Sequence, residues 1–331
     1  MNSPFLLKPV GKDYLWGGNR LNTDFGKGIS MSPLAETWEC STHPDGISIV
    51  SSGVHKGELL SDVLRSHSEY IGSHPLGIGN LAGMPAGTLP ILIKFIDAKE
   101  DLSIQVHPDD DYAKEHENGS LGKTEMWYVL DAAEDSKLIY GLREAVGREE
   151  MEKSLADGSV IKYVQKINVH KNDVFYIPAG TIHAIGRGAL IAEIQENSNL
   201  TYRLYDYERT DKNGNKRQLH TEKALDVANL RSMSEPKQPL RVLRYRKGVA
   251  SELLARCKYF LVERVLLNTS ERAETVEFET GSNSFEVFLC IEGGGEIKDT
   301  LSFKKGDCIF APADSGKMLF AGTAQLLKVM C

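Results

Sequence analysis

The sequence predicts a mainly β fold built from two jelly-roll β-barrels with a few short helices. Short apolar runs follow one another along most of the chain and are separated by turns rich in Gly, Pro, Asn and Asp. Helical periodicity is confined to a few brief segments. A sequence of turn, apolar strand and Pro-Ala occurs twice, at residues 172–179 and 306–313. This repeat favours two barrels over one continuous α/β sheet.

Composition limits the class of protein. A length of 331 residues suggests two domains, or one domain with an appendage. A net charge of -7 argues against nonspecific nucleic-acid binding, although a local basic pocket for a phosphate is compatible with it. No apolar run approaches a membrane span, and the N-terminus has no long apolar stretch. We expect a monomer or weak homo-oligomer whose partner is a small molecule, with no nucleic acid and no membrane.

The cysteines indicate the compartment. Five cysteines are scattered through the chain, their number is odd, and none forms a Cys-x-x-Cys pair. A full disulfide framework is therefore not expected, and a reducing cytoplasm fits best.

The first hundred residues alternate between irregular and regular structure. Residues 1–54 read as turns and short strands. Leu59, Leu60, Val63 and Leu64 recur at helical spacing, which predicts a helix near 58–73. After this helix, Pro75 and the Gly-rich residues 77–87 predict a break in regular structure. Residues 90–98 predict a buried strand.

The next hundred residues read mostly as strand, turn and strand. Helices are expected only near 147–157 and 219–230. The predicted strands lie near 101–107, 124–132, 136–141, 160–167, 173–177, 182–186, 189–196 and 200–206. We expect residues 1–235 to form an N-terminal catalytic domain, with the helix near 58–73 as an insertion.

A second barrel is expected after a Pro-containing linker at 231–240. Its predicted strands lie at 259–267, 275–279, 284–292, 295–297, 300–303, 308–311 and 325–329. In this half Asp314-Ser315-Gly316 follows the Pro-Ala pair, where the first half has a His. The sequence therefore predicts a C-terminal barrel, residues 236–331, without a metal site.

Four polar residues of the first barrel suggest a metal site. Gln105 and His107 alternate with apolar neighbours, which places both side chains on one face of a strand. Glu125 opens the next strand, and His183 follows a Pro-Ala-Gly turn. Any one of these histidines alone is more often a surface or core residue. Two His, one Glu and one Gln together suit a borderline divalent ion such as zinc, with a position left for water or substrate.

The same segments resemble a known family. Ser103–Asp109, Lys123–Trp127, Pro178–Ala184 and Glu193–Arg203 together resemble the type I mannose-6-phosphate isomerases of the cupin superfamily. The length is similar to that of the short bacterial form. The resemblance covers nearly the whole chain and includes Trp16 with Gly17 and the segment 35–38.

The resemblance implies an aldose–ketose isomerase that interconverts mannose 6-phosphate and fructose 6-phosphate through a zinc-assisted cis-enediol(ate). It implies one Zn²⁺ per chain, and ion ligands at Gln105, His107, Glu125 and His183. Arg203 corresponds to the arginine taken as catalytic. Many members carry a Tyr two positions after the last ligand His. Ile185 stands there, so the role of that Tyr is not transferred.

The remaining roles are less sharply indicated. Glu193, within an apolar run, and Lys123, two residues before Glu125, are the candidates for proton transfer. No Gly-rich phosphate loop is present. The expected substrate-binding residues are Trp16, Lys94, Ser103 and Arg209, with Arg203 as a further phosphate donor.

Two other function classes fit a metal-binding cupin. One is a different metal-dependent enzyme, such as an iron dioxygenase or a sugar-modifying enzyme. The Gln ligand and the nearby basic residues argue against a dioxygenase. The other is a sugar-binding cupin without catalysis, which turnover of mannose 6-phosphate would exclude.

Overall fold

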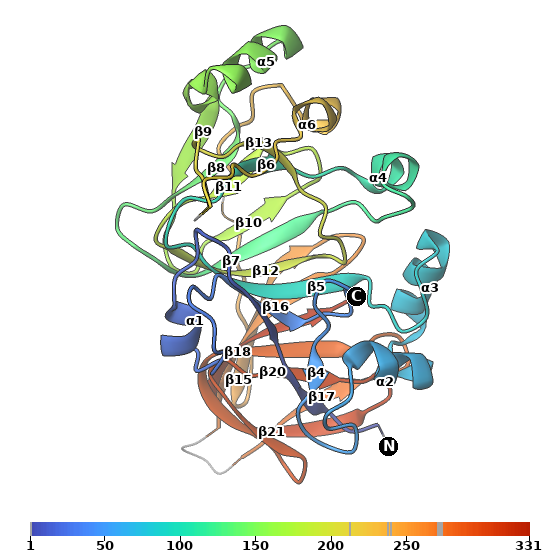
Figure 1. Ribbon diagram of the computed structural model, residues 1–331. Coiled ribbons are helices and arrows are strands. Elements are labelled where there is room, and N and C mark those ends of the chain that lie inside the picture. Colours follow the sequence, from blue (N-terminus) through green and yellow to red (C-terminus); the bar gives the residue numbers. More distant parts are fainter. Residues whose placement is uncertain (1, 212, 237, 239, 270–273) are drawn as a thin grey trace.

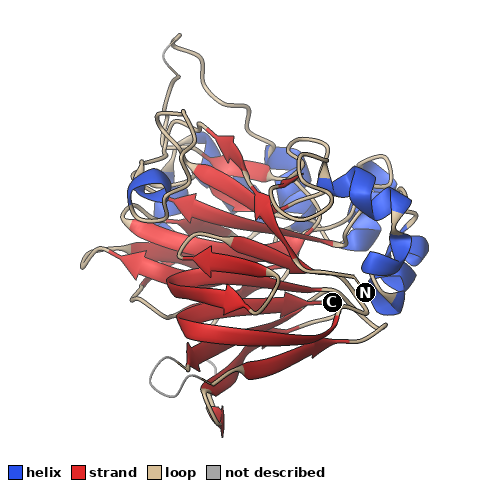
Figure 2. Cartoon of the chain, turned by 90° about the horizontal axis from the view of Figure 1, so that it is seen from below, coloured by secondary structure: helices blue, strands red, loops and turns tan. Residues whose placement is uncertain are grey.

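The computed structural model describes residues 2–211, 213–236, 238, 240–269 and 274–331. Its strands form three antiparallel sheets of five, six and ten strands, stacked in layers (Figure 1). Short helices lie at the periphery of these layers (Figure 2). The predicted mainly β fold with a few short helices is confirmed. No helix of the described segments is long and apolar enough to cross a membrane.

The five- and six-stranded sheets face each other across a shared core and are called the first unit here. The five-stranded sheet contains, in spatial order, β13 (Tyr202–Tyr205), β6 (Ile104–Val106), β11 (His183–Ile185), β8 (Lys137–Leu142) and β9 (Val164–Asn168). The six-stranded sheet contains β10 (Val174–Ile177), β7 (Glu125–Ala132), β12 (Ala189–Glu196), β5 (Ile91–Asp97), β3 (Glu36–Cys40) and β2 (Val10–Lys12). Trp127, Ile191 and Ile185 pack together between them.

The ten-stranded sheet forms most of the C-terminal unit. It contains β14 (Arg244–Arg246), β15 (Val249–Arg256), β16 (Leu261–Asn268), β17 (Val276–Thr280), β18 (Glu286–Ile297), β19 (Leu301–Lys304), β20 (Cys308–Ala311), β21 (Gly316–Met330), β1 (Phe5–Lys8) and β4 (Ile49–Val50). Phe278, Phe288 and Phe320 pack in its own core. A further core joins this sheet to the six-stranded one, so the two units share apolar contacts.

The helices cover edges and outer faces. They are α1 (Arg20–Thr23), α2 (Leu60–Ser66), α3 (Ser73–Ala82), α4 (Asp110–His116), α5 (Arg148–Ala156) and α6 (Thr221–Val227), with 3-10 turns at Ser68–Tyr70 and Ser159–Lys162. Met151 of α5 and Ala224 of α6 pack with Val106 on the outer face of the five-stranded sheet. The inner face of that sheet therefore carries both the apolar residues of the shared core and the polar residues described below.

Several sequence predictions are wrong in detail. The segment expected to break at Pro75 instead contains α3, because Pro75 stands in the first turn, where no backbone donor is lost. The N-terminal segment, expected to pack beside the first barrel and complete its sheets, is instead divided between two sheets. β2 and β3 lie in the six-stranded sheet, whereas β1 pairs with β20 and β4 pairs with β1 in the ten-stranded sheet. The strand expected at 325–329 is the end of the much longer β21. The domain boundary at residue 235 stays a prediction.

A buried ion pair within the N-terminal segment also contacts the C-terminal unit. Lys27 Nζ lies 2.7 Å from Glu39 Oε2, and the two side chains are only 3% and 0% exposed. The ammonium also donates to the carbonyl of Gly306. Burial raises the pKa of Glu39 even though Lys27 and Thr37 act to lower it. Loss of one partner would therefore leave an uncompensated buried charge.

We expect Lys27→Ala to lower the free energy of unfolding by about 3–5 kcal/mol, because it leaves the buried Glu39 carboxylate without a counter-charge. Chemical denaturation measures this change. The double variant Lys27→Met/Glu39→Gln removes both charges and should therefore recover most of the free energy of unfolding that Lys27→Ala loses. Lys304→Ala serves as the control, because the exposed Lys304–Asp307 pair should contribute less than about 1 kcal/mol. A Lys27→Ala variant as stable as Lys304→Ala would refute this account of the pair.

Candidate metal centre and active site

Strand alternation directs charged side chains into the first unit. Phe95 on β5 and Ala192 on β12 pack in the core toward the ten-stranded sheet. Successive residues of a strand point to opposite faces, so Lys94 and Glu193 point toward the five-stranded sheet. These two residues are also direct partners in the register of β12 and β5. The sheet therefore places a cation beside a carboxylate in the interior.

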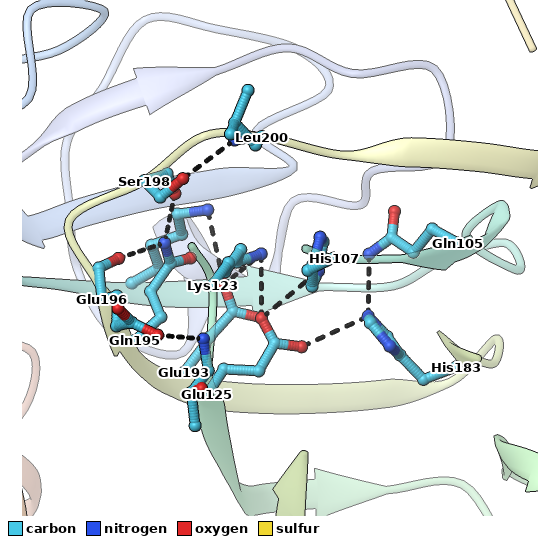
Figure 3. A network of polar contacts seen from close by, with 12 residues as sticks. Gln105, His107, Lys123, Glu125, His183, Glu193, Gln195, Glu196, Ser198 and Leu200 are labelled. Atoms are coloured by element: carbon cyan, nitrogen blue, oxygen red, sulfur yellow. Dashed lines mark hydrogen bonds and ion pairs between the residues drawn. The ribbon is translucent and has the colours of Figure 1, made fainter. Parts of the chain in front are cut away.

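His107, Glu125 and His183 converge on one buried point. One ligand-type atom from each lies within 4.8 Å of the others. His107 Nε2 is 3.6 Å from Glu125 Oε2, and His183 Nε2 is 3.3 Å from Glu125 Oε1. Figure 3 shows the two neighbouring imidazoles on the same side of the carboxylate, each contacting one of its oxygens. Such a group of three protein ligands can hold a metal ion and leave a position open.

Local backbone structure brings the two histidines together. His107 directly follows β6, and His183 begins β11. The amide of Gly180 donates to the carbonyl of His107 at 2.9 Å, which ties the turn before β11 to the residue after β6. Gly180 has a φ of 82°, a conformation that favours glycine. This conformation explains why a glycine follows Pro-Ala in this turn.

Both histidines are neutral and ready to bind a cation. His183 Nδ1 lies 2.8 Å from the carbonyl of Thr181, which only accepts, so Nδ1 carries the proton and the Nε2 lone pair faces the site. Burial lowers the pKa of His183 to about 4. Burial, followed by the charge of Lys123, lowers the pKa of His107 well below its usual value. Metal binding requires this unprotonated form.

The polar atoms of this group fit a divalent cation. His107 Nε2, the nitrogen that faces Glu125, has no hydrogen-bond partner among the described residues, although the side chain is buried. Burial and the nearby Glu193 raise the pKa of Glu125 to about 7. A bound cation would satisfy the imidazole and favour the ionised carboxylate. The chemistry of the donors therefore matches the ion that the sequence predicts.

Gln105 lies beside the group. In the register of the five-stranded sheet, Gln105 pairs with His183 on one side and with Arg203 on the other. Its amide nitrogen is 3.3 Å from His183 Nε2. A carbonyl oxygen, not this nitrogen, is the metal-ligating atom of an amide, so ligation by Gln105 requires the amide to rotate. Its role as a fourth ligand stays a prediction.

Two lysines neutralise the buried carboxylates. Lys123 Nζ lies 2.8 Å from Glu125 Oε2, and Lys94 Nζ lies 3.4 Å from Glu193 Oε1. The Trp127 indole donates to Glu193 Oε2 at 2.9 Å. Burial alone would raise the pKa of Glu193, but Lys123 and Lys94 outweigh it and lower that pKa. Glu193 is therefore an ionised carboxylate in a buried position.

A cavity of about 250 Å³ opens next to the metal-ligating group. Most of the predicted site residues line it: Trp16, Lys94, Ser103, Gln105, Lys123, Glu193 and Arg203. Sequence reasoning missed five further polar lining residues: Tyr14, Glu36, Asn199, Thr201 and Arg217. Ile185 also lines the cavity. The sequence could have indicated Glu36, because it stands in a run with strand alternation, two residues before Trp38. In the structure the Trp38 indole donates to Glu36 at 2.8 Å.

Arginine side chains gather at one side of the cavity. Arg203 Nε donates to Ser103 Oγ at 3.2 Å, and Arg203 Nη1 donates to the carbonyl of Gln218 at 2.8 Å. Arg217 donates to both carboxylate oxygens of Asp206. Burial, followed by the charge of Arg217, lowers the pKa of Arg203. The two guanidinium groups thus raise the positive potential of this region.

Arg209 lies behind this region, outside the cavity lining. Its guanidinium donates to Asp206 and to the carbonyl of Asp101. The structure therefore does not bring this predicted substrate-binding residue into the pocket. Arg217, eight residues later in a highly charged segment, lines the cavity instead. Its sequence neighbours form no periodic pattern that could have distinguished it.

We expect His107→Ala and His183→Ala to lose most of the bound divalent metal while the fold survives, because each removes one of three converging ligands. Elemental analysis after dialysis against zinc and then against buffer measures the content. His116→Ala is the control, since His116 is exposed and lies outside the group. Full metal content in either variant would contradict the assigned site.

Comparisons with known proteins agree with this geometry. Residues 5–136 match the family described as phosphomannose isomerase type I, catalytic domain. The mannose-6-phosphate isomerase ManA of Bacillus subtilis is 36% identical over 327 residues, which cover 98% of each chain. A crystal structure of the mannose 6-phosphate isomerase from Bacillus subtilis matches with 35% identity, a TM-score of 0.86 and 99% of each chain covered.

A second solved structure shares the fold at lower identity. It is a zinc-bound mannose 6-phosphate isomerase with 17% identity and a TM-score of 0.72, and the match covers 99% of each chain. The extent of the likeness to the relatives above 30% identity confirms the predicted membership and the predicted cupin fold. The chain belongs to the type I mannose-6-phosphate isomerase family.

Proposed function

We propose that this protein interconverts mannose 6-phosphate and fructose 6-phosphate as an aldose–ketose isomerase. One observation carries the proposal: an ionised buried carboxylate, Glu193, and a guanidinium, Arg203, line the same cavity beside a metal-ligating group. Relatives with full-length similarity are named for this activity. Base, charge stabiliser and metal ligands are the groups that this reaction requires.

The reaction needs a base that removes a proton from carbon. A proton leaves C2 of the aldose and reaches C1 of the ketose, while the hydroxyl proton on O2 moves to O1. Glu193 is the favoured base, because its carboxylate is ionised and faces the cavity. Trp127 fixes the orientation of this carboxylate through the indole donor. Lys123, the other candidate for proton transfer, contacts both Glu125 and Glu193 and would stabilise developing negative charge.

Arg203 would stabilise the enediolate that forms between the two proton transfers. Its guanidinium stays charged through the physiological pH range and can donate to two oxygens. Ser103 and the carbonyl of Gln218 hold it in place. A donor preorganised in this way stabilises charge in the transition state without having to reorient.

We propose one zinc ion per chain as the metal, with His107, Glu125 and His183 as ligands and Gln105 as a fourth. The donor set and the zinc-bound structure with the same fold support this choice. When bound, zinc would supply a Lewis acid for the C1 and C2 oxygens of the sugar. The free thiols of all five cysteines support the proposal of a reducing, cytoplasmic location.

The charge of the cavity supports a phosphorylated substrate. Its described lining holds four cationic side chains, Lys94, Lys123, Arg203 and Arg217, and two carboxylates, Glu36 and Glu193. The chain as a whole has a net charge of -7, so this cationic lining is a local feature. We propose that Arg217, together with Ser103, captures the phosphate. A cavity for an uncharged sugar would not need this excess of cations.

A coupled assay with mannose 6-phosphate tests the function. We expect turnover by the zinc-loaded protein, loss of turnover after removal of metal by a chelator, and recovery when zinc is restored. Unphosphorylated mannose should be a poor substrate. Binding of mannose 6-phosphate without turnover, at verified zinc content, would instead support the sugar-binding class.

We expect variants of the two arginines to separate catalysis from phosphate capture. Arg203→Ala should lower kcat by about a hundred- to a thousandfold, as for loss of an oxyanion donor, and Arg203→Lys should recover part of this. Arg217→Ala should mainly raise KM for the phosphorylated sugar, because its contact is equal in ground and transition states. Steady-state kinetics at equal zinc content measure both. The reverse pattern, a raised KM for Arg203→Ala with normal kcat, would overturn the assignment.

A further inference from the structure

One turn of the C-terminal unit contacts the first unit near the metal-ligating group. The turn between β15 and β16 carries Lys258 and Tyr259, and both contact Asp110 at the start of α4. The hydroxyl of Tyr259 donates to Asp110 Oδ2 at 2.5 Å, and Lys258 Nζ lies 3.2 Å from the same oxygen. The next residue, Phe260, is buried in the core shared by the two units. The turn is therefore held firmly against the first unit.

Asp110 also contacts the segment 122–125, which carries the site residues Lys123 and Glu125. Its second carboxylate oxygen, Oδ1, accepts the amide of Gly122 at 3.1 Å. The next amide, that of Lys123, donates to the carbonyl of Pro108 at 2.9 Å. Gly122 lies so close to the start of α4 that a Cβ atom there would come within 2.4 Å of the carbonyl carbon of Asp109. The backbone before Lys123 is thus fixed directly against Asp110.

Glu196 holds the same segment from the other side. Its Oε1 accepts the amide of Thr124 at 2.6 Å, and its own amide donates to the carbonyl of Thr124 at 3.1 Å. The side chain is buried. Three successive amides, at residues 122, 123 and 124, therefore donate to acceptors outside the segment. Lys123 and Glu125 project from this fixed stretch into the site (Figure 3).

We propose that Tyr259 is a positioning residue, which acts through Asp110 and Gly122 to orient Lys123 and Glu125. The inference rests on the proposed function for its catalytic consequence. The C-terminal unit contributes none of the described residues that line the cavity. Among the contacts that the C-terminal unit makes with the first unit, we assign its influence on the site to this hydroxyl, whose loss would let Asp110 rotate away from the Gly122 amide.

The hydroxyl matters more than the neighbouring ammonium. The Lys258 side chain is 70% exposed, so water and salt screen its charge. Tyr259 is half-buried and partly packed against the shared core, so its hydroxyl is held in one place. A fixed donor to a carboxylate restricts the direction of that carboxylate more than a mobile surface cation does. The two residues on one turn therefore provide a matched comparison.

We expect Tyr259→Phe, which keeps the ring and removes the donor, to weaken zinc binding by about tenfold, the lower end of the effect of outer-shell partners. Competition with a chelator measures the affinity. Hydrogen–deuterium exchange should show faster exchange of the amides at 122–124. Turnover of mannose 6-phosphate should fall in kcat more than it changes in KM. Lys258→Ala, on the same turn, and Tyr245→Phe, on the exposed strand β14, should leave all three unchanged.

Unchanged zinc affinity and unchanged exchange at 122–124 in Tyr259→Phe would overturn the inference, even if the melting temperature falls. Asp110→Ala provides a second route if that variant does not fold, because it removes both carboxylate oxygens, the acceptors of the Tyr259 hydroxyl and of the Gly122 amide. It should show the same weaker zinc binding and faster exchange. If the unaltered protein does not turn over mannose 6-phosphate, the proposed function fails, while zinc affinity and exchange still decide the role of Tyr259.

Discussion

The fully buried carboxylate of Glu125 is the constraint on which the site depends. Burying a charge costs several kcal/mol unless ion pairs or ligands compensate it. Lys123 supplies one compensating charge, and the two neutral imidazoles leave their lone pairs facing the same point. Lys123 contacts only one of the two oxygens, and His183 presents a lone pair to the other oxygen and cannot donate to it. A cation bound among the three would make this arrangement of Glu125 more favourable, so we expect metal binding and local order to be coupled.

Strand alternation explains why much of this site could be predicted from sequence. Glu125, Glu193 and Arg203 each stand in a run of apolar residues, and each run proved to be a strand with its apolar neighbours in a core. A polar residue in such a run must face a polar interior. His183 was found through the turn before it. The joint pattern of strand alternation and turn predicted that His107, Glu125 and His183 converge, and the resemblance to a family agreed with it.

The features that sequence reasoning missed depend on contacts between distant segments. Arg217 faces the cavity because Asp206, eleven residues earlier, holds its guanidinium, and no local period encodes that pairing. β1 joins the C-terminal sheet through β20, which lies some three hundred residues away. A short strand carries no sign of which sheet will accept it. The Pro and Gly residues of α3 signalled a break, yet the residues around them still form a helix.

The balance of interior charges differs between two regions of the first unit. Near Glu125 and Glu193, lysines and carboxylates are paired within 4 Å, so this region is close to neutral before a metal binds. Toward Arg203 and Arg217, cations exceed anions, since Asp206 is shared by Arg209 and Arg217. A substrate with a neutral reacting end and an anionic distal end would match both regions at once. For the phosphorylated sugar proposed above, the same gradient would fix the direction of binding, because the arginine side would compensate the phosphate and leave the carbonyl end beside Glu193 and the proposed metal ligands.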